Sequence, residues 1–117
     1  MPAYALAHLR TVDVNAEIVE YLERIDGSLE PFEGRFIVHG KIPEVIEEPF
    51  PGVVVIIEFP DLERARAWYE SDEYQAILPF RTENSDGSAI LVDGVGPDYR
   101  AADFAAAAVA QAGSGGS

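Results

Sequence analysis

The feature that most constrains the fold is an apolar run followed at once by a helix signal. The run Val53–Phe59 is apolar except for Glu58, which predicts a central strand covered on both faces. Asp61 follows in the position of an N-cap and opens an amphipathic helix that carries Trp68, the single tryptophan. We therefore expect a sheet with helices packed against it.

A second, short helix is predicted directly after the first. Ser71 or Asp72 can restart the helix over Tyr74, and Pro79 is expected to end it before Arg81. This stretch brings aromatic and charged side chains next to a buried strand. No other segment gathers as many groups able to recognise a ligand.

Strict alternation near the N-terminus predicts a strand over Ala3–Arg10. One face of this strand carries His8 and Arg10, and the other carries small alanines that favour close packing against a helix. Asp13 or Asn15 can cap the helix that follows. Two breakers are expected to end that helix: Gly27 and Pro31.

Further strands are predicted over Arg35–His39 and, after a polar loop, over Ser88–Asp93, with Glu44–Glu47 as an edge continuation. The order β-α-β-β-α-β matches the ferredoxin-like arrangement, an α+β fold with an antiparallel sheet and two helices on one face. The central strands are also apolar on their other face. A second subunit is the simplest cover, which predicts a homodimer built as a dimeric α+β barrel.

The end of the chain differs in composition from residues 1–94, which we expect to form one domain. Within residues 95–117, Asp98 can cap an alanine-rich helix, DYRAADFAAAAVAQA. Such a helix is marginal alone, so Tyr99, Phe104 and Val109 are candidates to dock it onto the body or a partner subunit. The closing GSGGS is typical of a flexible linker and also fits a cloning remnant.

Charge and cysteine content exclude several classes of function. The net charge of −13 disfavours binding to nucleic acid or anionic membranes. The 117 residues contain no cysteine, which excludes disulfides and thiolate catalysis and favours a reducing, cytoplasmic setting. The N-terminus shows no secretory signal, and no apolar run approaches the ~20 residues of a membrane span.

With these elements in place, the chain resembles the domain of unknown function 1330 family. The resemblance is carried by EFPDLERARAWYESDEYQAILPFR at residues 58–81, and more loosely by PAYALAHLR and EGRFIVHGK. It covers Met1 to about Gly94 and implies a ferredoxin-like dimeric α+β barrel, related in shape to small cofactor-independent monooxygenases, isomerases and decarboxylases. It implies no established activity. The recurrent family positions are Gly34, Gly40, Glu58, Phe59, Pro60, Trp68, Tyr74 and Arg81.

Two departures from the family pattern bear on the site. The family usually has paired glycines where Glu33 and Lys41 stand here, next to its two glycine positions. The family also tends to have an acidic residue at the position of His8. The resemblance therefore implies a different pocket chemistry for this chain.

Glu58 and His8 are the candidates for proton transfer. A carboxylate in an apolar strand costs free energy unless it is paired or protonated with a raised pKa, and a raised pKa suits a general base. The alternative is a structural ion pair between Glu58 and an arginine: Arg10, Arg35 or Arg81. His8 alternates toward one face and is favoured for the pocket, whereas His39, near a bend, is expected to be solvated.

No cofactor or metal is predicted. His8, His39 and Glu58 could compose a two-histidine, one-carboxylate site, but no short ligand spacing supports one. Gly34 and Gly40 do not fit a phosphate loop. Such a loop has one residue fewer between its two glycines, and it has Ser or Thr after the lysine, where this chain has Ile42.

The predicted substrate-binding residues are Trp68, Tyr74, Arg81 and Arg10. Aromatic rings can wall a pocket for a flat ligand, but for Trp68 core packing between helix and sheet is the favoured interpretation. Arg81 can bind a carboxylate or enolate, or can brace Glu58, Asp61 or the dimer seam.

The sequence thus predicts a homodimer that binds a small molecule. One hypothesis is a cofactor-independent enzyme that oxygenates, isomerises or cyclises a small acidic or aromatic substrate, with Glu58 or His8 transferring protons. The alternatives are a non-catalytic ligand-binding module and a protein-interaction module that uses the C-terminal helix.

Overall fold

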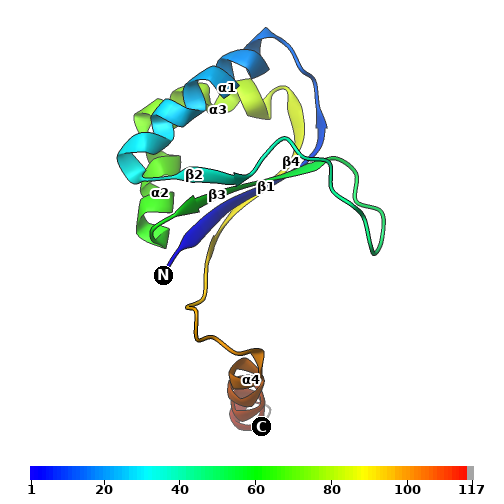
Figure 1. Ribbon diagram of the computed structural model, residues 1–117, viewed down its shortest axis with the longest axis vertical. Coiled ribbons are helices and arrows are strands. Elements are labelled where there is room, and N and C mark those ends of the chain that lie inside the picture. The colour runs from blue at the N-terminus through cyan, green and yellow to red at the C-terminus, as the bar shows by residue number, and fades with distance from the viewer. Residues whose placement is uncertain (116–117) are drawn as a thin grey trace.

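The computed structural model describes residues 1–115, which form a sheet, a layer of helices against one of its faces and a separate C-terminal helix (Figure 1). The strands are β1 (Ala3–Val12), β2 (Arg35–Val38), β3 (Val53–Phe59) and β4 (Ser85–Asp93). The helices are α1 (Ala16–Leu29), the 3₁₀ helix η1 (Glu30–Phe32), α2 (Leu62–Glu70), α3 (Asp72–Thr82) and α4 (Ala101–Gly115). The sheet has the order β2-β3-β1-β4 with antiparallel neighbours, which confirms the predicted ferredoxin-like α+β fold.

Helices α1, α2 and α3 cover one face of the sheet, which we call the helix face (Figure 1). Ala3 pairs with Phe59 across β1 and β3, and both side chains are almost completely buried. Strand β1 contacts α2, so the predicted close packing of the β1 alanines against a helix is confirmed for buried Ala3. The buried core lies here: Tyr21, Ile25, Leu29, Ile57, Phe59, Ala65, Trp68, Tyr74 and Ile77.

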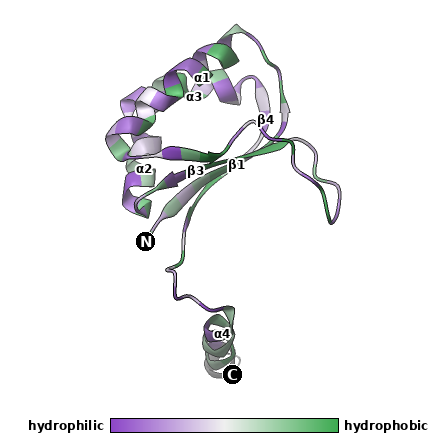
Figure 2. Cartoon of the chain, viewed as in Figure 1, coloured by the Kyte–Doolittle hydropathy of each residue, from purple (hydrophilic) through white to green (hydrophobic). Residues whose placement is uncertain are grey.

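The opposite face of the sheet, which we call the open face, is also partly apolar. Leu6 at its centre pairs with Ile56 of β3 and Ile90 of β4. Figure 2 shows hydrophobic colouring along most of β3. Ile90 is 52% exposed, so residues 1–115 leave an apolar surface uncovered on this side.

Three predicted helix caps are confirmed. The Asn15 side chain accepts hydrogen bonds from the backbone N–H groups of Glu17 and Ile18, both at 3.0 Å. Asp61 accepts one from the N–H of Arg64 at 2.7 Å. Ser71 ends α2 and accepts from the N–H of the third residue of α3, so one residue separates the two helices.

Two predicted helix ends are wrong. Helix α3 continues through Pro79 to Thr82, because the proline removes one N–H while neighbouring Leu78 and Phe80 still pack against the core. Helix α1 likewise continues through Gly27, but it ends at Leu29, before Pro31, the second predicted breaker, which lies in η1. The chain leaves the helical layer only after η1, where Glu33 adopts a left-handed conformation with φ of 59°.

Two of the predicted strands are longer in the structure. Beyond a bulge in β1, Thr11 pairs with Asp86 and Val12 with Ser85, so β4 begins at Ser85 within the predicted polar loop. Strand β2 ends at Val38, and the predicted edge segment Glu44–Glu47 is not a strand but part of a long loop.

Helix α4 begins at Ala101, so the predicted cap at Asp98 is wrong. Asp98 instead lies in a turn before the helix. In this turn the backbone N–H of Tyr99 donates to the carbonyl oxygen of Gly96 at 3.1 Å. Figure 1 shows α4 standing away from the sheet, and Phe104 is 64% exposed. Of the predicted flexible end, residues 113–115 form the last turn of α4 and residues 116–117 lie outside the described residues.

Candidate functional site

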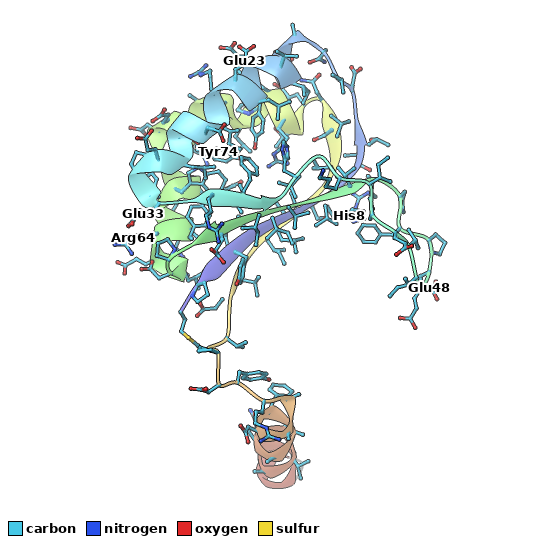
Figure 3. All side chains as sticks on the ribbon, viewed as in Figure 1. His8, Glu23, Glu33, Glu48, Arg64 and Tyr74 are labelled. Atoms are coloured by element: carbon cyan, nitrogen blue, oxygen red, sulfur yellow. The ribbon has the colours of Figure 1, made fainter. Side chains whose placement is uncertain are left out.

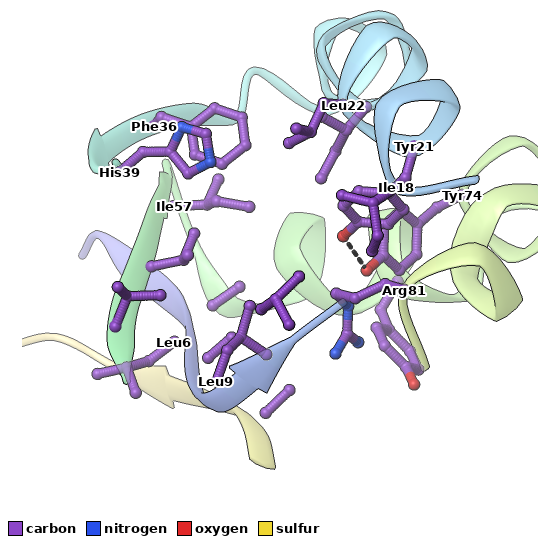
Figure 4. A pocket seen from close by; sticks show the side chains of 18 of the residues that line it. Leu6, Leu9, Ile18, Tyr21, Leu22, Phe36, His39, Ile57, Tyr74 and Arg81 are labelled. Atoms are coloured by element: carbon purple, nitrogen blue, oxygen red, sulfur yellow. Dashed lines mark hydrogen bonds between the residues drawn. The ribbon is translucent and has the colours of Figure 1, made fainter. Parts of the chain in front are cut away.

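A cavity of about 630 Å³ lies between the helix face of the sheet and helices α1 and α3 (Figure 4). Its volume falls in the range of about 300–1,000 Å³ that is usual for small-molecule sites. Aliphatic and aromatic side chains form most of its wall, with Leu9 and Ile57 from the sheet and Ile18 and Leu22 from α1. The cavity therefore favours a ligand that is largely apolar.

Two tyrosines and an arginine form one polar end of this cavity. The hydroxyl oxygens of Tyr21 and Tyr74 lie 2.8 Å apart and share a hydrogen bond, with the rings edge to face at 6.1 Å. Burial, followed by the proximity of Tyr74, raises the pKa of Tyr21 far above its ordinary value. The Tyr21 hydroxyl is therefore protonated at neutral pH and acts as a hydrogen-bond donor or acceptor, not as a base.

Arg81, in the last turn of α3, is half-buried beside these hydroxyls (Figure 4). Burial alone would lower the pKa of Arg81, but Tyr74 and Tyr21 outweigh burial and hold that pKa above its ordinary value. Within residues 1–115, Arg81 forms no ion pair with a carboxylate. Its charge is available to a ligand.

The carboxylates that were predicted as partners of Arg81 form ion pairs with other arginines. Glu58 pairs with Arg35 at 2.8 Å, one of the three predicted pairings, and Asp61 pairs with Arg64 at 2.8 Å. Arg81 therefore does not brace Glu58 or Asp61, and its third predicted structural role, at the dimer seam, stays a prediction.

Trp68 belongs both to the core and to the cavity wall. Its indole Nε1 donates to Ser28 Oγ at 3.0 Å, and its ring lies 4.1 Å from that of Tyr74 and 5.4 Å from that of Phe59. The side chain is 3% exposed and still lines the cavity. Its fluorescence can therefore report on a ligand at the polar end.

Glu58, His8 and Arg10 lie on the open face, not in the cavity. Glu58 pairs across the strands with Tyr4, and in β1 the side chains of Tyr4, His8 and Arg10 alternate with those that face the helices. The expectation that His8 faces the pocket between sheet and helices is wrong for this reason. In Figure 3, His8 lies under the sheet beside the loop that carries Glu48, whereas Tyr74 lies in the helical layer.

Each of these open-face groups has a partner. His8 Nε2 donates to the carbonyl oxygen of Pro51 at 2.7 Å, and its ring stacks on Phe50 at 4.0 Å. Arg10 pairs with Asp86 at 3.0 Å. These contacts join β1 to the loop before β3 and to β4. A role of Glu58 and His8 in proton transfer stays a prediction.

His39 and Tyr21 contribute polar groups to the cavity but were not among the predicted site residues. His39 is exposed, as expected, and it also lines the cavity, where its ring lies 4.7 Å from that of Phe36. The signal was Gly40 beside it, whose φ of 73° turns the chain sharply after β2. Tyr21 could have been found from helical spacing, because it lies three residues after Ile18 on the buried stripe of α1.

The described residues include no cluster of three or more histidine or acidic side chains able to hold a metal ion. His8 and Glu58 lie on the open face and His39 lines the cavity, so this trio does not come together. Among helices within residues 1–115, none has the length and hydropathy needed to cross a membrane.

Solved structures share this fold at low sequence identity. The RPA0582 protein of unknown function from Rhodopseudomonas palustris is 16% identical, with a TM-score of 0.61, and the match covers 82% of this chain and 84% of that one. Methylated RPA0582 gives a TM-score of 0.63 at 16% identity over 84% of each chain. SnoaB, a cofactor-independent oxygenase from Streptomyces nogalater, is 13% identical with a TM-score of 0.51, over 85% of this chain and 96% of that one.

These likenesses concern the fold alone. A comparison with curated proteins finds no significant match. The family model described as a domain of unknown function, DUF1330, matches residues 2–95, which include the sheet, α1 to α3 and every cavity residue named above. The chain therefore belongs to the DUF1330 family.

Proposed function

We propose that this protein is a homodimer that binds a small, largely apolar organic acid in the cavity between its sheet and helices. One observation carries the proposal: Arg81 is half-buried at the end of an apolar cavity and has no carboxylate partner among residues 1–115. The hydroxyls of Tyr21 and Tyr74 lie beside Arg81, but a charge removed from water without a counter-ion costs free energy. The anionic group of a ligand would supply that partner.

The chemistry of the polar end favours a carboxylate or enolate. The planar guanidinium of Arg81 can donate two parallel hydrogen bonds to such a group. Tyr21 and Tyr74 share one hydrogen bond between them, so one of their two hydroxyl hydrogens is left for a ligand oxygen. Arg81 would bind the charge and the tyrosine pair would orient it.

The test compares aromatic acids with their uncharged amides. Benzoate, phenylacetate and cinnamate are titrated against the protein while the fluorescence of Trp68 is followed, and each amide is titrated in the same way. We expect the acids to bind at least about tenfold tighter, since hydrogen bonds to charged groups contribute about 1.5–3 kcal/mol. Arg81→Gln should remove this preference.

Arg66→Gln is the matched control, because Arg66 is exposed on α2 and does not line the cavity. It should retain the preference for acids. The proposal fails if acids and amides bind equally well, or if Arg66→Gln weakens the acids as much as Arg81→Gln does.

The homodimer would use the open face. Ile90 and Leu6 present apolar surface there, and a second copy is the simplest cover. A charge at Ile90→Glu would be buried in such an interface, which should weaken dimerisation by at least about 100-fold. Sedimentation equilibrium would detect the loss, with Val19→Glu on the outer side of α1 as the control. A wild-type protein that is monomeric at all concentrations would overturn this part.

The enzymatic form of the proposal is a cofactor-independent oxygenation, isomerisation or cyclisation of the bound acid. The fold shared with SnoaB supports it only by analogy. Glu58 and His8 would transfer protons only to a ligand that reaches the open face. An activity that survives Glu58→Gln and His8→Ala would remove both from the mechanism.

The exposed helix α4 favours a second candidate, a protein-interaction module. Removal of residues 96–117 distinguishes the two: loss of a partner with small-molecule binding intact supports the interaction module. Loss of small-molecule binding would instead tie the tail to the cavity.

A further inference from the structure

The cavity has a second polar end, formed by His39. Figure 4 shows His39 beside Phe36 at one side of the cavity, and Arg81 with the two tyrosines at the other. The exposed ring of His39 packs against Phe36 at 4.7 Å, and within the described part of the chain neither ring nitrogen forms a hydrogen bond to a protein group. Its nitrogens are available to a ligand that enters here.

The wall between the two polar ends is apolar. Leu9 and Ile57 lie on the sheet side, and Ile18 and Leu22 on the helix side. A ligand that reaches from one end to the other must therefore be apolar in its middle. A flat ring between these two layers would contact aliphatic side chains on both of its faces.

We propose that the ligand is a hydroxyaryl carboxylic acid, with its carboxylate at Arg81, its ring in the apolar middle and its hydroxyl at His39. This proposal rests on the proposed function, because it takes the carboxylate at Arg81 as given. It adds the substrate class and makes His39 the residue that selects for it.

A hydroxyl fits His39 better than a second charge does. A hydroxyl both donates and accepts, so it pairs with a ring nitrogen of either tautomer. A second carboxylate would enter a protein of net charge −13 whose one cavity arginine is already used. An ammonium group would share an apolar cavity with the guanidinium of Arg81, which is unfavourable for both charges.

The test uses matched pairs of ligands that differ by one hydroxyl. The pairs are 4-hydroxybenzoate with benzoate, 4-hydroxyphenylacetate with phenylacetate, and 4-hydroxycinnamate with cinnamate, which together vary the span between the two groups. Calorimetric titration gives each dissociation constant. At least one hydroxylated acid should bind about three- to tenfold tighter than its partner, the net effect of one hydrogen bond.

Variants assign that preference to His39. His39→Leu should abolish the preference for the hydroxylated acid and leave the affinity for its unhydroxylated partner unchanged. His39→Asn, whose amide still donates and accepts, should keep part of it. Because His39 is exposed and follows the end of β2, both variants are expected to fold.

Each outcome decides between the two proposals. If the acids bind through Arg81 but no pair shows a preference that depends on His39, the substrate class is wrong and the acid-binding cavity stands. If His39→Leu weakens both members of each pair equally, His39 only shapes the cavity. If no acid binds at all, the proposed function and this inference both fail.

Discussion

Stability above pH 9 provides a direct test of the buried hydroxyl pair. Tyr21 is 7% exposed, and its hydroxyl bonds that of Tyr74 at 2.8 Å. Burial, with the proximity of Tyr74, raises the pKa of Tyr21 in the folded state. In the unfolded chain a tyrosine has a pKa of about 10. The folded state therefore binds the Tyr21 proton more tightly than the unfolded state does.

The sign of the effect follows from proton linkage. Below pH 10 both states carry the proton, and the raised pKa has no net effect on the dependence of stability on pH. Above pH 10 the unfolded chain loses the proton while folded Tyr21 keeps it, so the free energy of unfolding falls. The slope approaches about 1.4 kcal/mol per pH unit, and the accumulated loss at pH 11 is about 1.4 kcal/mol from this one group.

Urea unfolding at a series of pH values between 8 and 11 measures this slope. Tyr21→Phe should flatten it by the amount given above, even though the lost hydrogen bond lowers stability at every pH. Tyr99→Phe is the matched control, because Tyr99 is exposed in the segment before α4. An unchanged slope in Tyr21→Phe would refute the idea that the folded protein holds this hydroxyl protonated.

Three further predictions concern stability and use urea unfolding at neutral pH. Gly34→Ala should cost about 1–3 kcal/mol, because the new Cβ would lie 2.6 Å from Cε1 of buried Phe59; a cost near zero would mean that the core yields easily. Asn15→Ala should cost about 1 kcal/mol through loss of the α1 cap, and Asn15→Ser should restore most of it. Removal of residues 96–117 should change the unfolding free energy by less than about 0.5 kcal/mol, and a larger loss would reveal contacts of α4 with the body.

The elements of the body could be predicted because local signals agree with the tertiary contacts. Val53–Phe59 is the observed extent of β3, and Asn15 and Asp61 cap the helices they were expected to cap. The element ends failed where a long-range contact overrode a local breaker. Gly27 stays helical because the next turn of α1 carries Ser28 and Leu29, both buried in the core.

The aromatic part of the site could be predicted because its residues lie close together in the sequence. Trp68 and Tyr74 flank one helix junction, and their rings meet at 4.1 Å. Tyr21 and His39 come from α1 and from the end of β2, and no local pattern relates them to α3. Their convergence depends on how the helices cross the sheet, which is set by long-range packing and leaves no local pattern in the sequence.

By contrast, the side of the sheet on which a residue lies could have been deduced from the alternation of side chains along a strand. The β1 alanines were expected to pack against a helix, and strict alternation then places His8 on the opposite face. A cavity between sheet and helices could not include it. The same alternation excludes Glu58, which pairs with Tyr4 on the face of His8.

The position of Arg81 was not predicted correctly, because Pro79 was expected to end the helix. Tyr74, Ile77 and Arg81 are spaced three and four residues apart, so a continuous helix places all three on one face. Ending the helix at Pro79 breaks this spacing and releases Arg81 from the face of Tyr74. Because buried Ile77 and the packed Phe80 keep the helix intact across the proline, the guanidinium instead lies beside the tyrosine pair, where it places a positive charge at the end of an apolar cavity.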